Sequence, residues 1–187
     1  MPSLSILICT LDRRKEYLDR LIRCLSAQTT SEVEIITDHH PTDSIGTKRD
    51  RLLSKATGEY CVFIDDDDLV APNYIPLILK AIESKPDVVD INLIMTTDGI
   101  RAERSFHMLS IKEWSEKEDL NIAGHKFYLR YPNHLNPVKT EIAKKVGFIP
   151  ISEGEDKDYS KRLQPYLRNS VYIHQPIYFY LHTSTPL

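Results

Sequence analysis

Residues 58–68, Gly-Glu-Tyr-Cys-Val-Phe-Ile-Asp-Asp-Asp-Asp, place four adjacent carboxylates directly after a short run of aromatic and β-branched side chains. Such a run is typical of a buried strand, here residues 60–64. Four neighbouring carboxylates repel one another, so a fold keeps them together only where solvent or a cation relieves the charge. The stretch therefore predicts a central strand that ends in an acidic loop.

Strand and helix patterns alternate around this stretch. The expected strands cover residues 4–9, 33–37, 60–64 and 88–94. Helices are expected after a capping Asp12, over 45–56 and from Pro72, because apolar side chains recur there at helical spacing. This alternation predicts an α/β fold in which a mostly parallel sheet is flanked by helices, in a single domain.

The second half of the chain is less regular. Residues 96–134 are polar and mixed, and we interpret them as an insertion that shapes a pocket. Asn136-Pro137 is expected to start a helix that Gly147 ends, and residues 155–167 are expected to form another. Residues 171–173 and 177–181 have the pattern of closing strands.

Length and composition narrow the class of protein. The chain has 187 residues, a mass of 21.6 kDa, a net charge of −3 and 41% hydrophobic residues, which suits one packed domain. No stretch is long enough for a membrane span, and no secretory signal is visible. The slight acidity gives no strong nucleic-acid signal. Three cysteines without a C-x-x-C pair favour reduced thiols in the cytoplasm.

Ligands of open parallel sheets bind outside the carboxyl ends of the strands. The residues that follow the first three strands are Thr10 and Asp12, then 38–40, then the acidic run 65–68. Hard cations such as Mg²⁺ and Mn²⁺ prefer oxygen ligands, usually one or two carboxylates plus phosphate oxygens. The acidic run thus predicts a site for a metal and a diphosphate, with a solvated acidic turn as the alternative.

Four stretches, in chain order, resemble the family-two nucleotide-sugar glycosyltransferases, which have a GT-A (Rossmann-like) fold. Residues 5–13 resemble the opening strand of that family, and 58–68 its central strand with a DXD-type metal motif. Residues 154–163 resemble its Glu-Asp segment, and 177–182 its closing Tyr-x-Tyr-x-x-His strand. The resemblance implies a nucleotide-binding half over 1–95 and an acceptor-binding, catalytic half over 96–187.

The resemblance also implies roles for single residues. Asp67 and His182 are expected to hold Mn²⁺ or Mg²⁺. A further set is expected to bind the nucleoside-diphosphate sugar: Thr10, Asp12, Asp38, Lys48, Arg49, Asp65 and Asp66. The acceptor is expected to be a glycan, a lipid-linked sugar or another hydroxyl-bearing molecule. The insertion carries basic residues that could meet an anionic acceptor, although a solvated basic face explains them as well: Arg101, Arg104, His107, Lys126 and Arg130.

Asp156 is expected to be the catalytic base, with Glu155 beside it and Asp158 as the next candidate. A carboxylate at a helix start is kept ionised by free backbone N–H groups. His134 and Trp114 are candidates for acceptor binding, although loop anchoring and packing explain them as well. A single in-line displacement predicts inversion at the anomeric carbon.

The function expected from this pattern is a metal-dependent glycosyltransferase. Two alternatives stay open. A haloacid-dehalogenase-like phosphotransferase also carries D-x-D at a strand end, but normally on its first strand. A nucleotide-sugar-binding module without activity would keep the binding residues and lack turnover.

Overall fold

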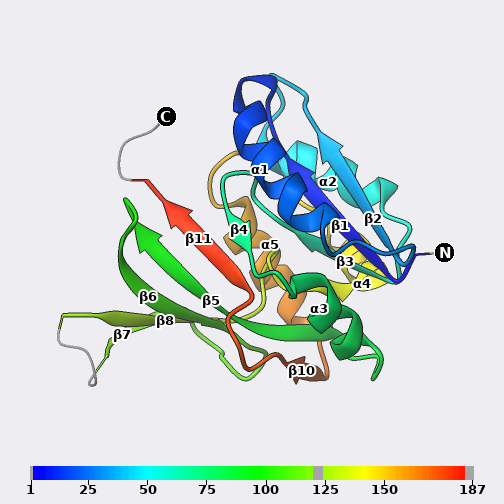
Figure 1. The fold of residues 1–187 in the computed structure, drawn as a ribbon. Helices are drawn as coiled ribbons and strands as arrows, with labels where there is room; N and C mark the ends of the chain where they lie inside the picture. Colours follow the sequence, from blue (N-terminus) through cyan, green and yellow to red (C-terminus); the bar gives the residue numbers. More distant parts are fainter. Residues whose placement is uncertain (1, 120–123, 184–187) are drawn as a thin grey trace.

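The computed structural model describes residues 2–119 and 124–183, and one sheet runs through it in the order β2-β1-β3-β9-β5-β6-β8-β7 (Figure 1). The strands expected in the first half are present, with β5 three residues longer than expected. They are β1 (Leu4–Cys9), β2 (Val33–Asp38), β3 (Tyr60–Phe63) and β5 (Val88–Thr97). The helices between them are α1 (Lys15–Ser26), α2 (Ile45–Lys55) and α3 (Tyr74–Ile82).

Strand β1 is the centre of the parallel part of the sheet. It pairs in parallel with β2 on one side and with β3 on the other. Their carboxyl ends therefore meet at one edge, where the residues after each strand come together. The mixed sheet and its flanking helices confirm the α/β fold of the GT-A type.

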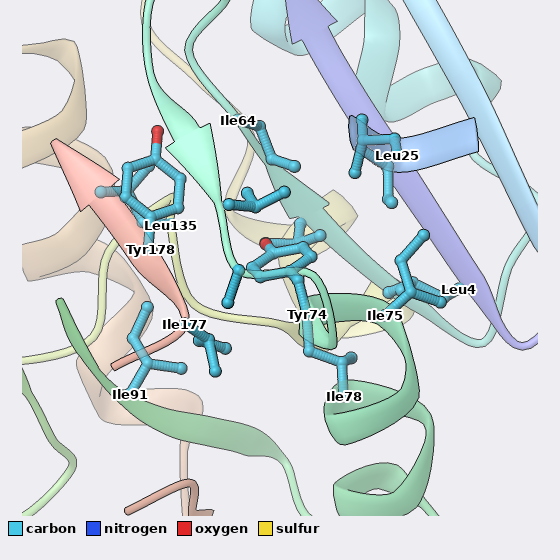
Figure 2. Close-up of a cluster of buried hydrophobic side chains, with 14 of the residues drawn as sticks. Leu4, Leu25, Ile64, Tyr74, Ile75, Ile78, Ile91, Leu135, Ile177 and Tyr178 are labelled. Carbon is cyan, nitrogen blue, oxygen red and sulfur yellow. The ribbon is translucent and has the colours of Figure 1, made fainter. Parts of the chain in front are cut away.

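Alternate side chains of β1 serve two cores, because successive strand residues point to opposite faces. On one face Leu4 and Ile6 pack with Leu21 of α1 and Ile78 of α3. Figure 2 shows this cluster around Tyr74, with Ile91 and Tyr178 contributed from β5 and the chain end. On the other face Leu7 packs with α2 and with the C-terminal helices.

Three expected helix starts are wrong. Asp12 does not cap α1: it opens a 3₁₀ turn, Asp12–Arg14, and α1 begins at Lys15 without a side-chain cap. Helix α3 begins at Tyr74 and not at Pro72. Asn136 does not start a helix, because its side chain is buried and donates to the carbonyls of Val89 and His107.

The insertion at 96–134 extends the sheet. Strand β6 (Ile100–His107) pairs antiparallel with β5, β8 (Lys126–Arg130) lies parallel to β6, and β7 (Ser115–Glu118) closes the edge. Figure 1 shows this extension curving away from the α1 and α2 layer. The expected pocket-shaping insertion is thus a set of strands whose side chains alternate between two faces.

The remaining segments close the fold. Strand β9 (Val138–Lys139) leads into α4 (Thr140–Val146), which Gly147 ends as expected. Helix α5 (Glu155–Leu163) continues as a 3₁₀ turn over Gln164–Tyr166. Strands β10 (Ser170–Tyr172) and β11 (Tyr178–His182) lie parallel to β5, and the short β4 (Leu69–Val70) pairs with β11. None of the described helices is long and apolar enough to cross a bilayer.

Candidate active site

A cleft of about 840 Å³ opens at the carboxyl ends of β1 and β3. It has two walls of different construction. The first wall is made by the residues after β1 and β3 and by the starts of α2 and α5. The second wall is one face of β5, β6 and β8, completed by Tyr180 and His182 of β11.

The middle of the acidic run is tied to the first strand. Asp66 is buried, accepts a hydrogen bond from the Thr10 hydroxyl (2.6 Å) and is held by Arg14 through Nε (3.0 Å) and Nη2 (2.6 Å). The same Arg14 Nη2 lies 2.7 Å from Asp67. The Asp67 side chain is 40% exposed, the most of the four aspartates, and faces the cleft. Arg14 therefore relieves the repulsion between the two carboxylates.

Asp65 is held by side chains from two other parts of the chain. Arg49 Nη2 lies 2.9 Å from one carboxylate oxygen, and His134 Nε2 lies 3.5 Å from the other. Burial opposes ionisation of Asp65, but Arg49 and His134 outweigh it and hold the pKa of this carboxyl well below its usual range. These contacts therefore favour the ionised form of Asp65.

Asp68 has the opposite electrostatics. Burial and the charge of Asp65 raise the pKa of Asp68 to about 8. Its carboxyl accepts hydrogen bonds from the Tyr178 hydroxyl (2.6 Å) and from the Leu181 backbone N–H (2.8 Å). Asp68 thus joins the acidic loop to β11.

Arg49 connects the acidic loop to the Glu-Asp segment. It is buried, and its Nη1 donates to Glu155 at 2.6 Å while its Nη2 donates to Asp65. The rings of Phe63 and Phe148 lie against the guanidinium, with centroids 5.9 and 5.8 Å from it. Burial raises the pKa of Glu155, and Arg49 partly offsets the rise. Arg49 and Glu155 thus both line the cleft and form an ion pair with each other.

Asp156 lies one residue further on, with less protein around it. It lines the cleft, is half-buried, and its Oδ1 accepts the Lys157 backbone N–H at 2.7 Å in the first turn of α5. This is the orientation by a helix start that the sequence predicts. Asp158 instead pairs with Arg162 through Nε (2.7 Å) and does not line the cleft. Of the two carboxylates, Asp156 is therefore the one that can reach a molecule bound in the cleft.

The second wall carries a neutral polar chain. Asn133 Oδ1 accepts the Leu135 backbone N–H at 3.0 Å, so it acts as an acceptor toward His107 Nδ1 at 3.2 Å. His107 Nε2 is then left to accept from the Ser105 hydroxyl, also at 3.2 Å. Burial lowers the pKa of His107 to about 3, so its ring stays uncharged.

The structure brings most of the predicted site residues to this cleft. Those that line it are Thr10, Lys48, Arg49, Asp65, Asp66, Asp67, Trp114, His134, Glu155, Asp156 and His182. It does not bring in Asp12, whose carboxylate lies 3.1 Å from His39 and is 93% exposed. Nor does it bring in Asp38, which is buried and held by Arg51 Nε at 2.6 Å.

Sequence reasoning missed several residues that line the cleft. Arg14 follows Asp12 by two residues, and its position after the first strand was the available signal. Ser105 and Tyr128 lie on strands of the insertion, and no local motif marks them. Arg130 was among the basic residues that could meet an anionic acceptor, but nothing in the sequence distinguished it from the others. Only the pairing of β6 with β8 brings them together.

The cleft is lined by two of the predicted metal donors, Asp67 and His182. The described residues contain no group of three or more His, Cys, Asp or Glu side chains able to hold a metal ion. Asp67 nevertheless presents an exposed carboxylate to the cleft, and His182 lies on the same rim. One or two carboxylates plus phosphate oxygens are the usual ligands of Mg²⁺ at nucleotide sites.

The comparisons with known proteins agree with this geometry. The family model described as "Glycosyl transferase family 2" matches residues 38–137, just over half of the chain. A search of curated proteins found no match.

Solved structures with the same fold include that of S. aureus TarS. Its fragment 1–349 in complex with UDP-GlcNAc has a TM-score of 0.72 at 15% identity, and the match covers 100% of this chain and 60% of the TarS fragment. The complex of the same fragment with UDP has a TM-score of 0.70 at 15% identity, with 97% and 60% covered. The chain thus spans 60% of the length of these fragments.

Proposed function

We propose, from the premise that the chain belongs to glycosyl transferase family 2, that it transfers a sugar from a nucleoside diphosphate to an acceptor hydroxyl. The observation that carries the proposal is the convergence of Asp67, Asp65 and Asp156 on one cleft at the carboxyl ends of β1 and β3. Family membership also disfavours the haloacid-dehalogenase alternative, and the acidic run follows β3 and not the first strand.

The donor is proposed to lie along the first wall. Lys48 is buried, donates to the Thr10 carbonyl at 2.7 Å, and has no carboxylate partner among the residues that the structure describes. Its charge is therefore available to a diphosphate. We assign Asp67 and His182 to a divalent cation, which when bound supplies positive charge against the diphosphate. UDP and UDP-GlcNAc are the first donors to test, because the S. aureus fragment was crystallised with both.

The transfer step is assigned to Asp156. The acceptor oxygen attacks the anomeric carbon, the bond from that carbon to the diphosphate oxygen breaks, and the electron pair leaves with the diphosphate. The hydroxyl proton moves to the Asp156 carboxylate, which a general base must hold within about 3 Å. One such displacement inverts the anomeric carbon. Asp65, Arg49 and Glu155 hold the start of α5 against the acidic loop and so position the base.

The experiment is incubation of the purified chain with UDP-GlcNAc and other UDP-sugars, Mn²⁺ and a set of hydroxyl acceptors. We expect Mn²⁺-dependent release of UDP and a glycoside whose anomeric configuration, measured by NMR, is opposite to that of the donor. Retained configuration would contradict the single displacement. Binding of UDP without any turnover would favour the inactive binding module.

The compartment proposed is the cytoplasm. Cys9, Cys24 and Cys61 are all free thiols, as a reducing compartment would leave them.

A further inference from the structure

Arg130 is an arginine of the cleft whose charge has no carboxylate partner among the described residues. Its Nη1 donates to two backbone carbonyls, those of Ser115 (2.9 Å) and Leu129 (3.0 Å). Two arginines of the first wall differ in this respect, because Arg14 is paired with Asp66 and Arg49 with Glu155. Glu116 acts on Arg130 only without a direct ion pair, so the guanidinium brings positive charge to the second wall.

The Arg130 guanidinium packs against two aromatic rings. It lies 5.0 Å from the Trp114 ring centroid and 5.3 Å from that of Tyr128. Tyr128 is itself fixed by donating its hydroxyl to Glu103 at 2.9 Å. A planar guanidinium fixed in this way loses little freedom when its remaining N–H groups bind an oxyanion in two-point fashion.

The face of the cleft around Arg130 is polar. Arg130 is opposite His107 in the register of β6 and β8, and Tyr128 is opposite Ser105. Glu103, on the same face of β6, accepts the Tyr128 hydroxyl. Leu93 and Met95 of β5 complete the face and are apolar. A half-buried cation without a direct ion pair on such a face suits the binding of a negatively charged group on a hydroxyl-rich molecule.

The subsite is adjacent to the proposed base. Lys157 Nζ lies 5.9 Å from the Trp114 ring centroid, on the ring that also packs on Arg130. Lys157 directly follows Asp156 and donates its backbone N–H to it. A molecule anchored at Arg130 therefore has its neighbouring hydroxyls close to the first turn of α5.

We propose that the acceptor carries a carboxylate or phosphate group and that Arg130, packed against Trp114 and Tyr128, binds this group. This inference rests on the proposed function and names the chemical class of its acceptor. It adds Arg130 and Tyr128 to the site as specificity-determining residues, and gives Trp114 a role in holding Arg130.

The chain provides its own reporter, because Trp114 is the single tryptophan. The protein is titrated with glucuronic acid, glucose 6-phosphate and glucose at constant ionic strength, with UDP and Mn²⁺ saturating the donor site. We expect the two anionic sugars to change the tryptophan fluorescence and glucose to bind at least about tenfold more weakly, the typical effect of a hydrogen bond to a charged group. Which anion binds more tightly distinguishes a carboxylate acceptor from a phosphate one.

Arg130→Gln is expected to raise the dissociation constant for the anionic sugars at least about tenfold. Arg104→Gln is the matched control, because Arg104 is exposed on the opposite face of β6 and does not line the cleft. Arg130→Lys keeps the charge without the two-point geometry and is expected to be intermediate. Circular dichroism of each variant confirms folding.

Equal responses to glucose and to its anionic relatives, no response to any of the three, or unchanged affinity in folded Arg130→Gln would each overturn the proposal. A UDP-induced thermal shift is measured in parallel. If UDP does not shift the melting temperature of the wild type, the proposed function is contradicted. If UDP does shift it but the anionic sugars give no fluorescence response, only the proposed acceptor class is contradicted.

Discussion

The two walls of the cleft are built by different rules. The first wall consists of residues that follow strands or open helices, so its functional side chains are neighbours in sequence, as in the run from Asp65 to Asp68. The second wall is one face of strands, so its side chains are two residues apart, as Ser105 and His107 are. The proposed donor side is therefore encoded in local sequence motifs, whereas the proposed acceptor side depends on the register between strands.

The walls also differ in their charges. On the first wall acidic groups are matched by arginines, so removing one partner leaves a buried charge. On the second wall the His107 chain is neutral and Arg130 lacks a carboxylate. The first wall is consequently expected to be the more sensitive to mutation, both in activity and in folding.

The largest expected effect is on catalysis. Asp156→Asn is expected to lower the transfer rate by about 10²–10⁴-fold, because the hydroxyl proton loses its acceptor. The rate is measured as release of UDP from the donor that the wild type uses. UDP-induced thermal stabilisation is expected to stay unchanged.

Asp158→Asn is the control for that variant, because its side chain pairs with Arg162 and does not line the cleft. Its transfer rate is expected to match the wild type. If Asp156→Asn transferred sugar at the wild-type rate, the base would have to be sought elsewhere on the first wall.

The next effect is on folding and tests the charge pairing of the first wall. Arg49→Leu is expected to cost about 3–5 kcal/mol of unfolding free energy, since Asp65 and Glu155 lose their shared partner. Urea unfolding followed by circular dichroism measures it. The exposed Arg104→Leu on β6 is expected to change stability by less than about 0.5 kcal/mol. Similar costs for the two variants would refute the charge pairing proposed for the first wall.

Two glycine substitutions, one at the start of α2 and one in the β5–β6 turn, are expected to have smaller effects on stability. Gly46 opens α2 where a Cβ would lie 1.8 Å from the Ile149 carbonyl oxygen, so Gly46→Ala is expected to cost about 3 kcal/mol. Gly99 lies in the β5–β6 turn at φ +73° with no atom near a Cβ, so Gly99→Ala is expected to cost about 1 kcal/mol through backbone strain alone.

Denaturant midpoints of the two alanine variants provide the measurement. The reverse order of stability would mean that the segment around Ile149 yields more readily than the structure shows. Transfer activity of Gly99→Ala is expected to equal that of the wild type, because the turn does not line the cleft.

The strands behind the first wall could be predicted from the sequence, and the strands that form most of the second wall could not. Strands at residues 4–9, 33–37 and 60–64 were readable because each is a short apolar run bounded by turn or capping residues. The starts of α1 and α3 were misplaced because Asp12 and Pro72 are residues that commonly start a helix. In the structure α1 begins at Lys15, after a 3₁₀ turn, and α3 begins at Tyr74. The insertion was unreadable as strands because its alternation carries polar side chains on both faces.

For the candidate site, the acidic run was expected in the cleft because it follows a strand, whereas Lys48, Arg49 and Asp156 were expected there because of the resemblance to the family. Asp38 also follows a strand, but Arg51, one turn after Lys48 in α2, holds its carboxylate. Tyr128 could not be predicted, and Arg130 could not be told apart from the other basic residues of the insertion, because their approach to Ser105 and His107 depends on a pairing between strands about twenty residues apart.

Calorimetric titration of UDP with Mn²⁺ tests the central assignment most directly, using the wild type, Asp67→Asn and the exposed Asp19→Asn. We expect chelation of the metal, or Asp67→Asn, to weaken UDP binding at least about tenfold, and Asp19→Asn to leave it unchanged. Equal affinity for UDP in all three proteins, with or without a chelator, would contradict a cation held by Asp67 at the end of β3.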